Sequence, residues 1–89
     1  MAVVRLDAML KEFTSRSRFE TTAPTVGALL DELEREVPRL KFKLRDETGA
    51  LRRYVRVFVD GHDVSQSSGV ASSLAGARTV DILHSIAGG

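Results

Sequence analysis

Two short stretches near the start of the chain alternate apolar and polar residues with the period of a β-strand. Residues 3–8 form the first stretch, and the apolar side chains on its one face are Val4, Leu6 and Ala8. Residues 18–22 form the second, which is rich in residues that favour strands. Phe13, between the two, is expected to fold back onto the core. The pattern predicts a β-hairpin with a loose loop.

An apolar stripe with helical spacing follows Pro24, and it consists of Val26, Leu29, Leu30, Leu33 and Val37. Thr25 is a favourable N-cap residue for this helix. Pro38 ends the helix, because proline has no N–H and disfavours helical geometry in the residue before it. The spacing predicts a helix of about 12 residues, roughly 18 Å long. Its solvent-facing side chains would be Asp31, Glu32, Glu34, Arg35 and Glu36.

Residues 39–53 are ambiguous. Leu40, Phe42 and Leu44 alternate with basic residues, and the chain turns at Thr48–Gly49. This alternation fits a short edge strand, since edge strands commonly carry Lys and Arg, and a helical extension fits equally well. The sequence leaves both interpretations open.

The second half of the chain contains two further strands. Residues 54–59 have high β-propensity, and Asp60–Gly61 is a turn signal that needs a left-handed backbone. Val64 is expected to pair briefly with that strand. Residues 79–83 form the last predicted strand, in which Val80 and Ile82 share a face.

The serine-rich segment 65–73 separates these strands. It is too short to link two domains, and Val70 and Leu74 are expected to attach it to the core as an ordered loop or one helical turn. Gly76 marks a turn before the last strand.

The predicted order is strand, strand, helix, strand, strand. A right-handed connection through the helix places the first and last strands parallel in the middle of a mixed sheet, with the helix on one face. We therefore predict an α+β fold of the β-grasp type. Residues 1–89 would form one domain with a flexible tail from about residue 84 to residue 89.

The amino-acid composition excludes several kinds of functional site. Of the 89 residues 43% are apolar and none is cysteine, which excludes disulfides, thiolate metal sites and cysteine nucleophiles. Apolar runs are far shorter than the roughly 20 residues that span a bilayer, and the N-terminal apolar stretch is too short for a secretory signal. We expect a cytoplasmic protein that does not enter a membrane.

Charge is unevenly distributed. The formal net charge is +1, but residues 35–56 contain eight basic and three acidic side chains. This segment is either a docking surface for an acidic partner or a solvated face. The same two interpretations hold for the cluster formed by Lys41, Lys43, Arg45, Arg52 and Arg53. Binding of nucleic acid is not expected, because the few aromatic residues are mostly needed in the core.

No internal active site is predicted. The chain has two histidines, His62 and His84, and no glycine-rich phosphate-binding motif. Asp60, His62 and Asp63 lie on one tight turn from which their side chains diverge, so the pattern indicates a turn and no metal site. His84 and Ser85 are strand neighbours that point to opposite faces, which argues against a nucleophile pair.

The remaining candidate is the C-terminal Gly88–Gly89. A carboxylate there would be inert until an enzyme activates it, most simply by letting it attack the α-phosphorus of ATP. Glycines would let the tail enter a narrow channel, because neither residue has a Cβ.

Two segments carry a resemblance to a known family. These are residues 51–64, LRRYVRVFVDGHDV, and residues 80–89, VDILHSIAGG, with support from Gly69–Val70 and from the helix that begins after Thr25. Together they resemble the MoaD/ThiS family of ubiquitin-like sulfur carriers, and the longer CysO-like form most of all. The resemblance implies a β-grasp fold and a non-catalytic carrier that binds no cofactor.

The resemblance also implies partners and site residues. An E1-like adenylyltransferase would use ATP to adenylate Gly89, a sulfur donor would convert the adenylate to a thiocarboxylate, and a sulfur-acceptor synthase of cysteine or molybdopterin synthesis would receive the sulfur. Gly88, Ala87 and Ile86 would form the tail. The expected partner surface comprises Phe58, His84, Arg52 and Arg53. Alternatives are a ubiquitin-like modifier joined to lysines through Gly89, or the small subunit of molybdopterin synthase.

Two positions depart from the family pattern. His84 stands where many members have proline, and residues 75–78 replace a frequent Gly-Asp turn. The first change is expected either to extend the last strand by one residue or to alter the exit angle of the tail, and the second is expected to alter partner preference.

Overall fold

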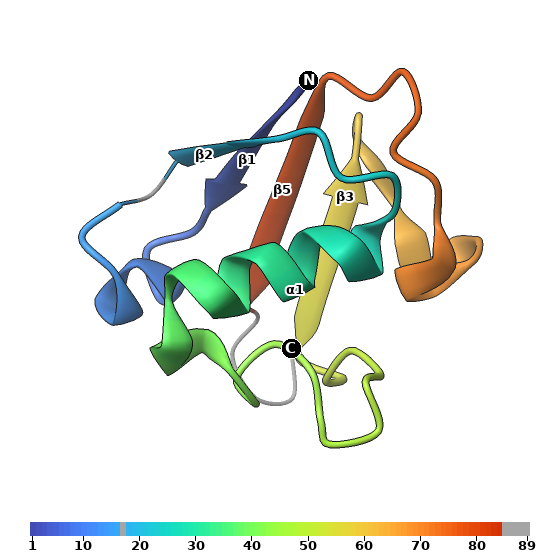
Figure 1. The fold of residues 1–89 in the computed structure, drawn as a ribbon. Coiled ribbons are helices and arrows are strands. Elements are labelled where there is room, and N and C mark those ends of the chain that lie inside the picture. Colours follow the sequence, from blue (N-terminus) through green and yellow to red (C-terminus); the bar gives the residue numbers. More distant parts are fainter. Residues whose placement is uncertain (17, 85–89) are drawn as a thin grey trace.

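A computed structural model describes residues 1–16 and 18–84 of the chain. Within these residues five strands form one mixed sheet in the order β2-β1-β5-β3-β4. The strands are β1 (Ala2–Leu6), β2 (Arg18–Thr21), β3 (Val55–Val59), β4 (His62–Asp63) and β5 (Thr79–His84). One helix, α1 (Val26–Glu36), lies across one face of the sheet (Figure 1). This is the β-grasp arrangement that the sequence predicts.

The first and last strands are central and parallel, as predicted. β1 pairs with β5 in the register Val4 opposite Val80, and it pairs antiparallel with β2, which confirms the hairpin. The other side of β5 pairs antiparallel with β3. One expectation is wrong: Ala8 lies beyond the end of β1 and is exposed.

The helix begins and ends where the sequence predicts. The Thr25 side-chain oxygen accepts a hydrogen bond from the Ala28 N–H at 3.1 Å, and the helix ends at Glu36, before Pro38. Val26, Leu29, Leu30 and Leu33 are buried against the sheet, and Val37, just past the helix, packs on the core. Glu34 differs from the prediction, because its side chain is only 14% exposed.

Residues 38–54 form neither a strand nor a helical extension. A 3₁₀ turn, η2 (Pro38–Leu40), is followed by loop structure in which Arg45 and Leu51 form an isolated bridge. Leu40 and Leu44 are buried while Phe42 is 50% exposed. The period-2 pattern arises because a tight turn directs the middle residue outward.

The segment between β3 and β5 is ordered by turns. Asp60 and Gly61 have φ values of 49° and 87°, the left-handed geometry expected there. The pairing with β3 is made by β4 rather than by Val64, which begins the 3₁₀ turn η3 (Val64–Gln66). A second 3₁₀ turn, η4 (Gly69–Ala71), follows, and Leu74 is buried. The remaining 3₁₀ turn of the described residues, η1 (Leu10–Phe13), joins β1 to β2.

The core lies between α1 and the sheet. The sheet and helix contribute most of its fully buried side chains, which include Val4, Val57, Val80, Ile82, Val26, Leu29 and Leu30. Leu10, Leu40 and Leu44 close its edges from the connecting segments. In the described residues no helix has the length and apolar character needed to cross a bilayer.

Candidate functional site at the end of the last strand

The predicted tail is only partly covered by the structure. Gly89, Gly88, Ala87 and Ile86, together with Ser85, lie outside the described residues. The last described residue is His84, which ends β5 opposite Val55 of β3. The geometry around His84 therefore defines the end of the described part of the chain.

The backbone of His84 is held by Asp7. Its N–H donates to Asp7 Oδ2 at 2.7 Å, and the other oxygen of the same carboxylate accepts from the Leu10 N–H at 3.0 Å. The Asp7 N–H in turn donates to the Ile82 carbonyl at 3.2 Å. In a parallel ladder, one residue bonds to two residues of the neighbouring strand that lie two positions apart. Here these two are Ile82 and His84, and the Asp7 side chain supplies the acceptor for His84 after β1 has ended. This contact fixes the last residue of β5 against the β1–η1 junction.

The side chain of His84 is held on the β3 side. Its ring lies against that of Tyr54, with centroids 4.8 Å apart and the planes tilted by 55°. The His84 Nδ1 atom is buried and has no hydrogen-bond partner among residues 1–16 and 18–84. The ring thus serves as a packing element at the end of the sheet.

Arg52 and Arg53 lie in the loop just before β3, next to Tyr54. The Arg52 Nε donates to the Phe42 carbonyl at 2.7 Å, and the Arg52 N–H donates to the Leu44 carbonyl at 2.9 Å. Arg53 is exposed. The loop of residues 41–54 therefore lies at the end of the sheet where β5 finishes and β3 begins (Figure 1).

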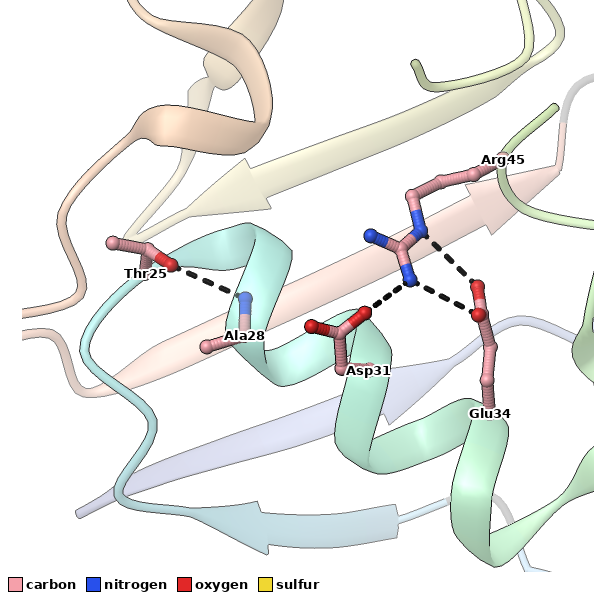
Figure 2. A network of polar contacts seen from close by, with 5 residues as sticks. All are labelled: Thr25, Ala28, Asp31, Glu34 and Arg45. Atoms are coloured by element: carbon pink, nitrogen blue, oxygen red, sulfur yellow. Dashed lines mark hydrogen bonds and ion pairs between the residues drawn. The ribbon is translucent and has the colours of Figure 1, made fainter. Parts of the chain in front are cut away.

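Arg45 differs from the other basic residues of this loop. Its guanidinium donates to Glu34 at 3.0 and 3.1 Å and to Asp31 at 2.7 Å (Figure 2). These hydrogen bonds, with Glu34 as the main partner, raise the pKa of Arg45. Only 13% of the Arg45 side chain is exposed, so it attaches the loop to α1 and does not belong to a free basic surface.

Phe58 lies apart from the other predicted surface residues. It is half-buried in β3 on the helix-free face of the sheet, opposite Asp81 of β5. On the same face, Arg5 donates to Asp81 at 2.6 and 2.9 Å, and Leu83 is 39% exposed. The structure therefore brings His84, Arg52 and Arg53 to one end of the sheet and leaves Phe58 on its open face.

The Asp60–Asp63 turn uses its carboxylates for backbone hydrogen bonds. Asp60 Oδ1 accepts from the N–H groups of Arg78 and Thr79, both at 2.9 Å, and Asp63 Oδ1 accepts from Ser65. Within the described part of the chain no group of three or more His, Cys, Asp or Glu residues is placed to hold a metal ion. The Asp60 and Asp63 side chains therefore stabilise turns through backbone hydrogen bonds.

The ThiS family profile matches residues 4–89, which is nearly the whole sequence. The chain belongs to the ThiS family. It is accordingly a sulfur carrier protein of the ThiS type and not an enzyme.

Individual relatives agree with the family match. The sulfur carrier protein CysO of Mycobacterium tuberculosis strain H37Rv is 30% identical over 89 residues, which cover 97% of this chain and 96% of that protein. CysO in a crystal structure of the Amycolatopsis orientalis BexX/CysO complex is 28% identical, with a TM-score of 0.86 and full coverage of both chains. The small archaeal modifier protein 1 of Methanosarcina acetivorans, at 22% identity and a TM-score of 0.83 over 99% of this chain and 95% of that one, shares the fold.

Three residues at this end of the ThiS-family domain could not be identified from the sequence. Asp7 gives no local sign that its carboxylate meets β5, because His84 is 77 residues away. Tyr54 is the single tyrosine of the chain, but its contact with His84 depends on strand register. Phe42 looks like a core residue by spacing. No signal in the sequence identifies any of the three.

Proposed function

We propose that this ThiS-family protein transports sulfur as a thiocarboxylate on Gly89. The observation that supports the proposal most directly is that the family match continues through Ala87-Gly88-Gly89. The domain supplies a rigid base for that segment, since β5 is paired on both sides and its last described residue is bonded to Asp7.

The proposed sulfur-transfer cycle begins and ends with a free carboxylate on Gly89. The Gly89 carboxylate attacks the α-phosphorus of ATP, and pyrophosphate leaves. Sulfide supplied by the donor then attacks the acyl carbon of the adenylate, AMP leaves, and the terminal group becomes a thiocarboxylate. Its sulfur either displaces a leaving group from an electrophilic carbon held by the acceptor enzyme or adds to an electron-poor double bond, which then takes up a proton. Water hydrolyses the resulting thioester. The sulfur stays on the acceptor and Gly89 returns as a carboxylate.

Two protein partners follow from this cycle. An E1-like adenylyltransferase binds ATP and performs the first step, and a sulfur-acceptor enzyme receives the product. A CysO of Amycolatopsis orientalis has been crystallised in a complex with BexX, and CysO of Mycobacterium tuberculosis is named a sulfur carrier. These relatives support delivery of sulfur to a biosynthetic enzyme, of which cysteine synthesis is the branch indicated by the CysO likeness.

The surface for these partners includes the open end of the sheet. His84, Arg52 and Arg53 lie there, and the helix-free face adds Phe58 and Leu83. Aromatic residues and arginine, both present here, are enriched in surfaces that bind other proteins.

Intact mass spectrometry tests the proposal. The protein is incubated with an E1-like adenylyltransferase, ATP and a sulfide source, and the mass is expected to rise by the exchange of one oxygen atom for sulfur. A variant lacking Gly89 should not gain this mass, whereas His62→Ala, a change at the start of β4 and at the other end of β3 from Val55, should gain it. No gain in the wild-type protein, or an equal gain without Gly89, would overturn the proposal.

A second readout separates carriage from protein modification. If the activated Gly89 forms isopeptide bonds, target lysines will carry a branched remnant after digestion with trypsin, and this remnant will comprise residues 79–89 because the last cleavage site is Arg78. We expect free and thiocarboxylated protein and no such remnants.

A further inference from the structure

Phe42 occupies a turn position that normally belongs to glycine. The Lys43 N–H donates to the Leu40 carbonyl at 2.9 Å, Lys41 has φ −61° and ψ 132°, and Phe42 has φ 66°. These values define a type II turn with Phe42 as its third residue, where φ must be positive and glycine is preferred. A bulky residue in this geometry is strained.

The surrounding structure enforces this strained geometry. Leu40 and Leu44, on either side of the turn, are fully buried, so the chain must reverse direction between them. The carbonyl of Phe42 is fixed by the Arg52 Nε at 2.7 Å. The Phe42 ring gains little from the fold in return, because the residue remains 50% exposed.

Two lysines flank the exposed ring. Lys41 and Lys43 are both exposed, with the Lys41 Nζ 5.6 Å from the centre of the Phe42 ring and the Lys43 Nζ 5.4 Å from that of Phe13. Arg45 does not add to this charge, because Glu34 and Asp31 neutralise it. The acid that follows in the loop, Asp46, accepts hydrogen bonds from Thr48. The turn therefore presents an aromatic ring with the Lys41 ammonium beside it, while the Lys43 ammonium lies over the neighbouring Phe13 ring and the exposed Glu47 follows in the loop.

This turn is connected to the start of the tail. Arg52 bonds to the Phe42 carbonyl, and two residues later Tyr54 packs its ring on His84. A partner that draws the tail into its active site must approach the end of the sheet where His84 lies. The Phe42 turn is thus within the region that such a partner covers.

We propose that Lys41-Phe42-Lys43 is a docking element for the enzyme that activates the tail, with Phe42 entering an apolar pocket that has an acidic rim. Buried aromatic residues dominate the binding energy of many protein interfaces, and flanking charges orient the partner and accelerate association. The proposal rests on the function proposed above. We assign the element to the activating enzyme because activation is required in every cycle, whatever the acceptor.

The decisive variant is Phe42→Gly, because it separates stability from binding. Glycine suits the positive φ, so the melting temperature should equal or exceed that of the wild type. The concentration of carrier that half-saturates ATP–pyrophosphate exchange by the activating enzyme should rise about tenfold or more, with the maximal rate retained. A lower melting temperature, or an unchanged half-saturating concentration, would overturn the proposal.

Charge reversal provides an independent test. Lys41→Glu combined with Lys43→Glu should also raise the half-saturating concentration and should remove much of its dependence on salt. Arg18→Glu is the control, because Arg18 is exposed at the start of β2, the edge strand on the other side of β1 from β5. An effect of Arg18→Glu equal to that of either single lysine reversal would contradict a local docking element.

The outcomes also separate this inference from the function on which it rests. If the wild-type protein is not adenylated, the proposed function fails. If the wild-type protein is adenylated and the Phe42 and lysine variants behave like it, only the docking element fails. If these variants impair transfer to the acceptor and leave activation unchanged, the assignment to the activating enzyme is wrong.

Discussion

At the scale of single residues, aspartates in turns link neighbouring parts of the chain through backbone hydrogen bonds. The N–H groups of Thr79 and Arg78 lower the pKa of Asp60, in that order of importance. Hydrogen bonds from Thr48 lower the pKa of Asp46, and those from Ser65 lower that of Asp63. Each of these carboxylates interacts best in its charged form, so the fold binds fewer protons than the unfolded chain.

Asp60→Asn should reveal this coupling in the way the melting temperature falls at acidic pH. The folded-state pKa of Asp60 lies below the unfolded value of about 4. Its contribution is therefore present above that unfolded pKa and is lost as the pH falls through the folded pKa. We expect a lower melting temperature at neutral pH and a shallower decline below about pH 4. Asparagine also tolerates the left-handed backbone at this position.

Thermal unfolding followed at a series of pH values measures this effect. Glu47→Gln, which removes an exposed carboxylate from another loop, is the charge-matched control and should leave the shape of the curve unchanged. If the melting temperature of Asp60→Asn falls at acidic pH as steeply as that of the wild type, the role given to this carboxylate is contradicted.

Residue-scale features could be predicted only where they depend on near neighbours. The Thr25 cap and the Asp60–Gly61 turn follow from adjacent residues and were predicted. The Asp7–His84 bond and the Tyr54–His84 contact depend on which strands pair and in what register. The sequence pattern contains no such information at the precision of one hydrogen bond.

At the scale of elements, the first turn of α1 depends on one side-chain oxygen. Thr25→Ala removes the acceptor for the Ala28 N–H, and we expect the free energy of unfolding to fall by about 1 kcal/mol. Thr25→Ser keeps the oxygen and should stay close to the wild type. Equilibrium unfolding in urea measures both, and equal losses in the two variants would show that the methyl group, not the oxygen, is responsible.

The loop of residues 41–54 is attached to α1 through Arg45. Arg45→Ala would leave Glu34 largely buried without its partner, and we expect a loss of about 1.5–3 kcal/mol, because hydrogen bonds to charged groups are strong. Most of this loss belongs to Glu34, since Asp31 is exposed and its ion pair is screened by water.

Arg45→Lys distinguishes geometry from charge. Lysine keeps the positive charge but cannot form the paired hydrogen bonds to one carboxylate, so its unfolding free energy should lie between those of the wild type and Arg45→Ala. A lysine variant as stable as the wild type would mean that charge alone attaches the loop.

The same loop shows why one element was not predicted. The spacing of Leu40, Phe42 and Leu44 matches a strand, yet a tight turn produces the same spacing when its third residue points to solvent. A left-handed phenylalanine has no sequence signature, because the turn at this position normally signals itself through glycine. The helix, in contrast, has a five-residue stripe and clear end signals.

At the scale of the whole molecule, topology followed from the order of elements. Short alternating runs around one amphipathic helix permit few arrangements once crossovers must be right-handed, and the parallel central pair β1–β5 is the one observed. The terminal segment as the candidate site stays a prediction, made because its glycines stand out in the sequence. The shape of its base could not be predicted, because that base is assembled from Asp7, Tyr54 and His84.

Fold and function should therefore be separable by truncation. Deletion of Gly88 and Gly89 removes the proposed adenylation site but no residue of β5, which ends at His84. We expect the free energy of unfolding to change by less than about 0.5 kcal/mol, while adenylation is abolished. Calorimetry and mass spectrometry of the same sample measure the two effects, and a large drop in melting temperature would show that the tail contributes to the packed domain.

The position of β5 between β1 and β3 has a mechanical consequence. Because β1 and β5 are parallel, a pull on the end of β5 against the start of β1 loads the hydrogen bonds between them in shear, so that many must break together. The domain should withstand traction on its C-terminal segment far better than a sheet peeled from one edge. An enzyme could thus draw the C-terminal segment into a channel without unfolding the domain to which it is joined.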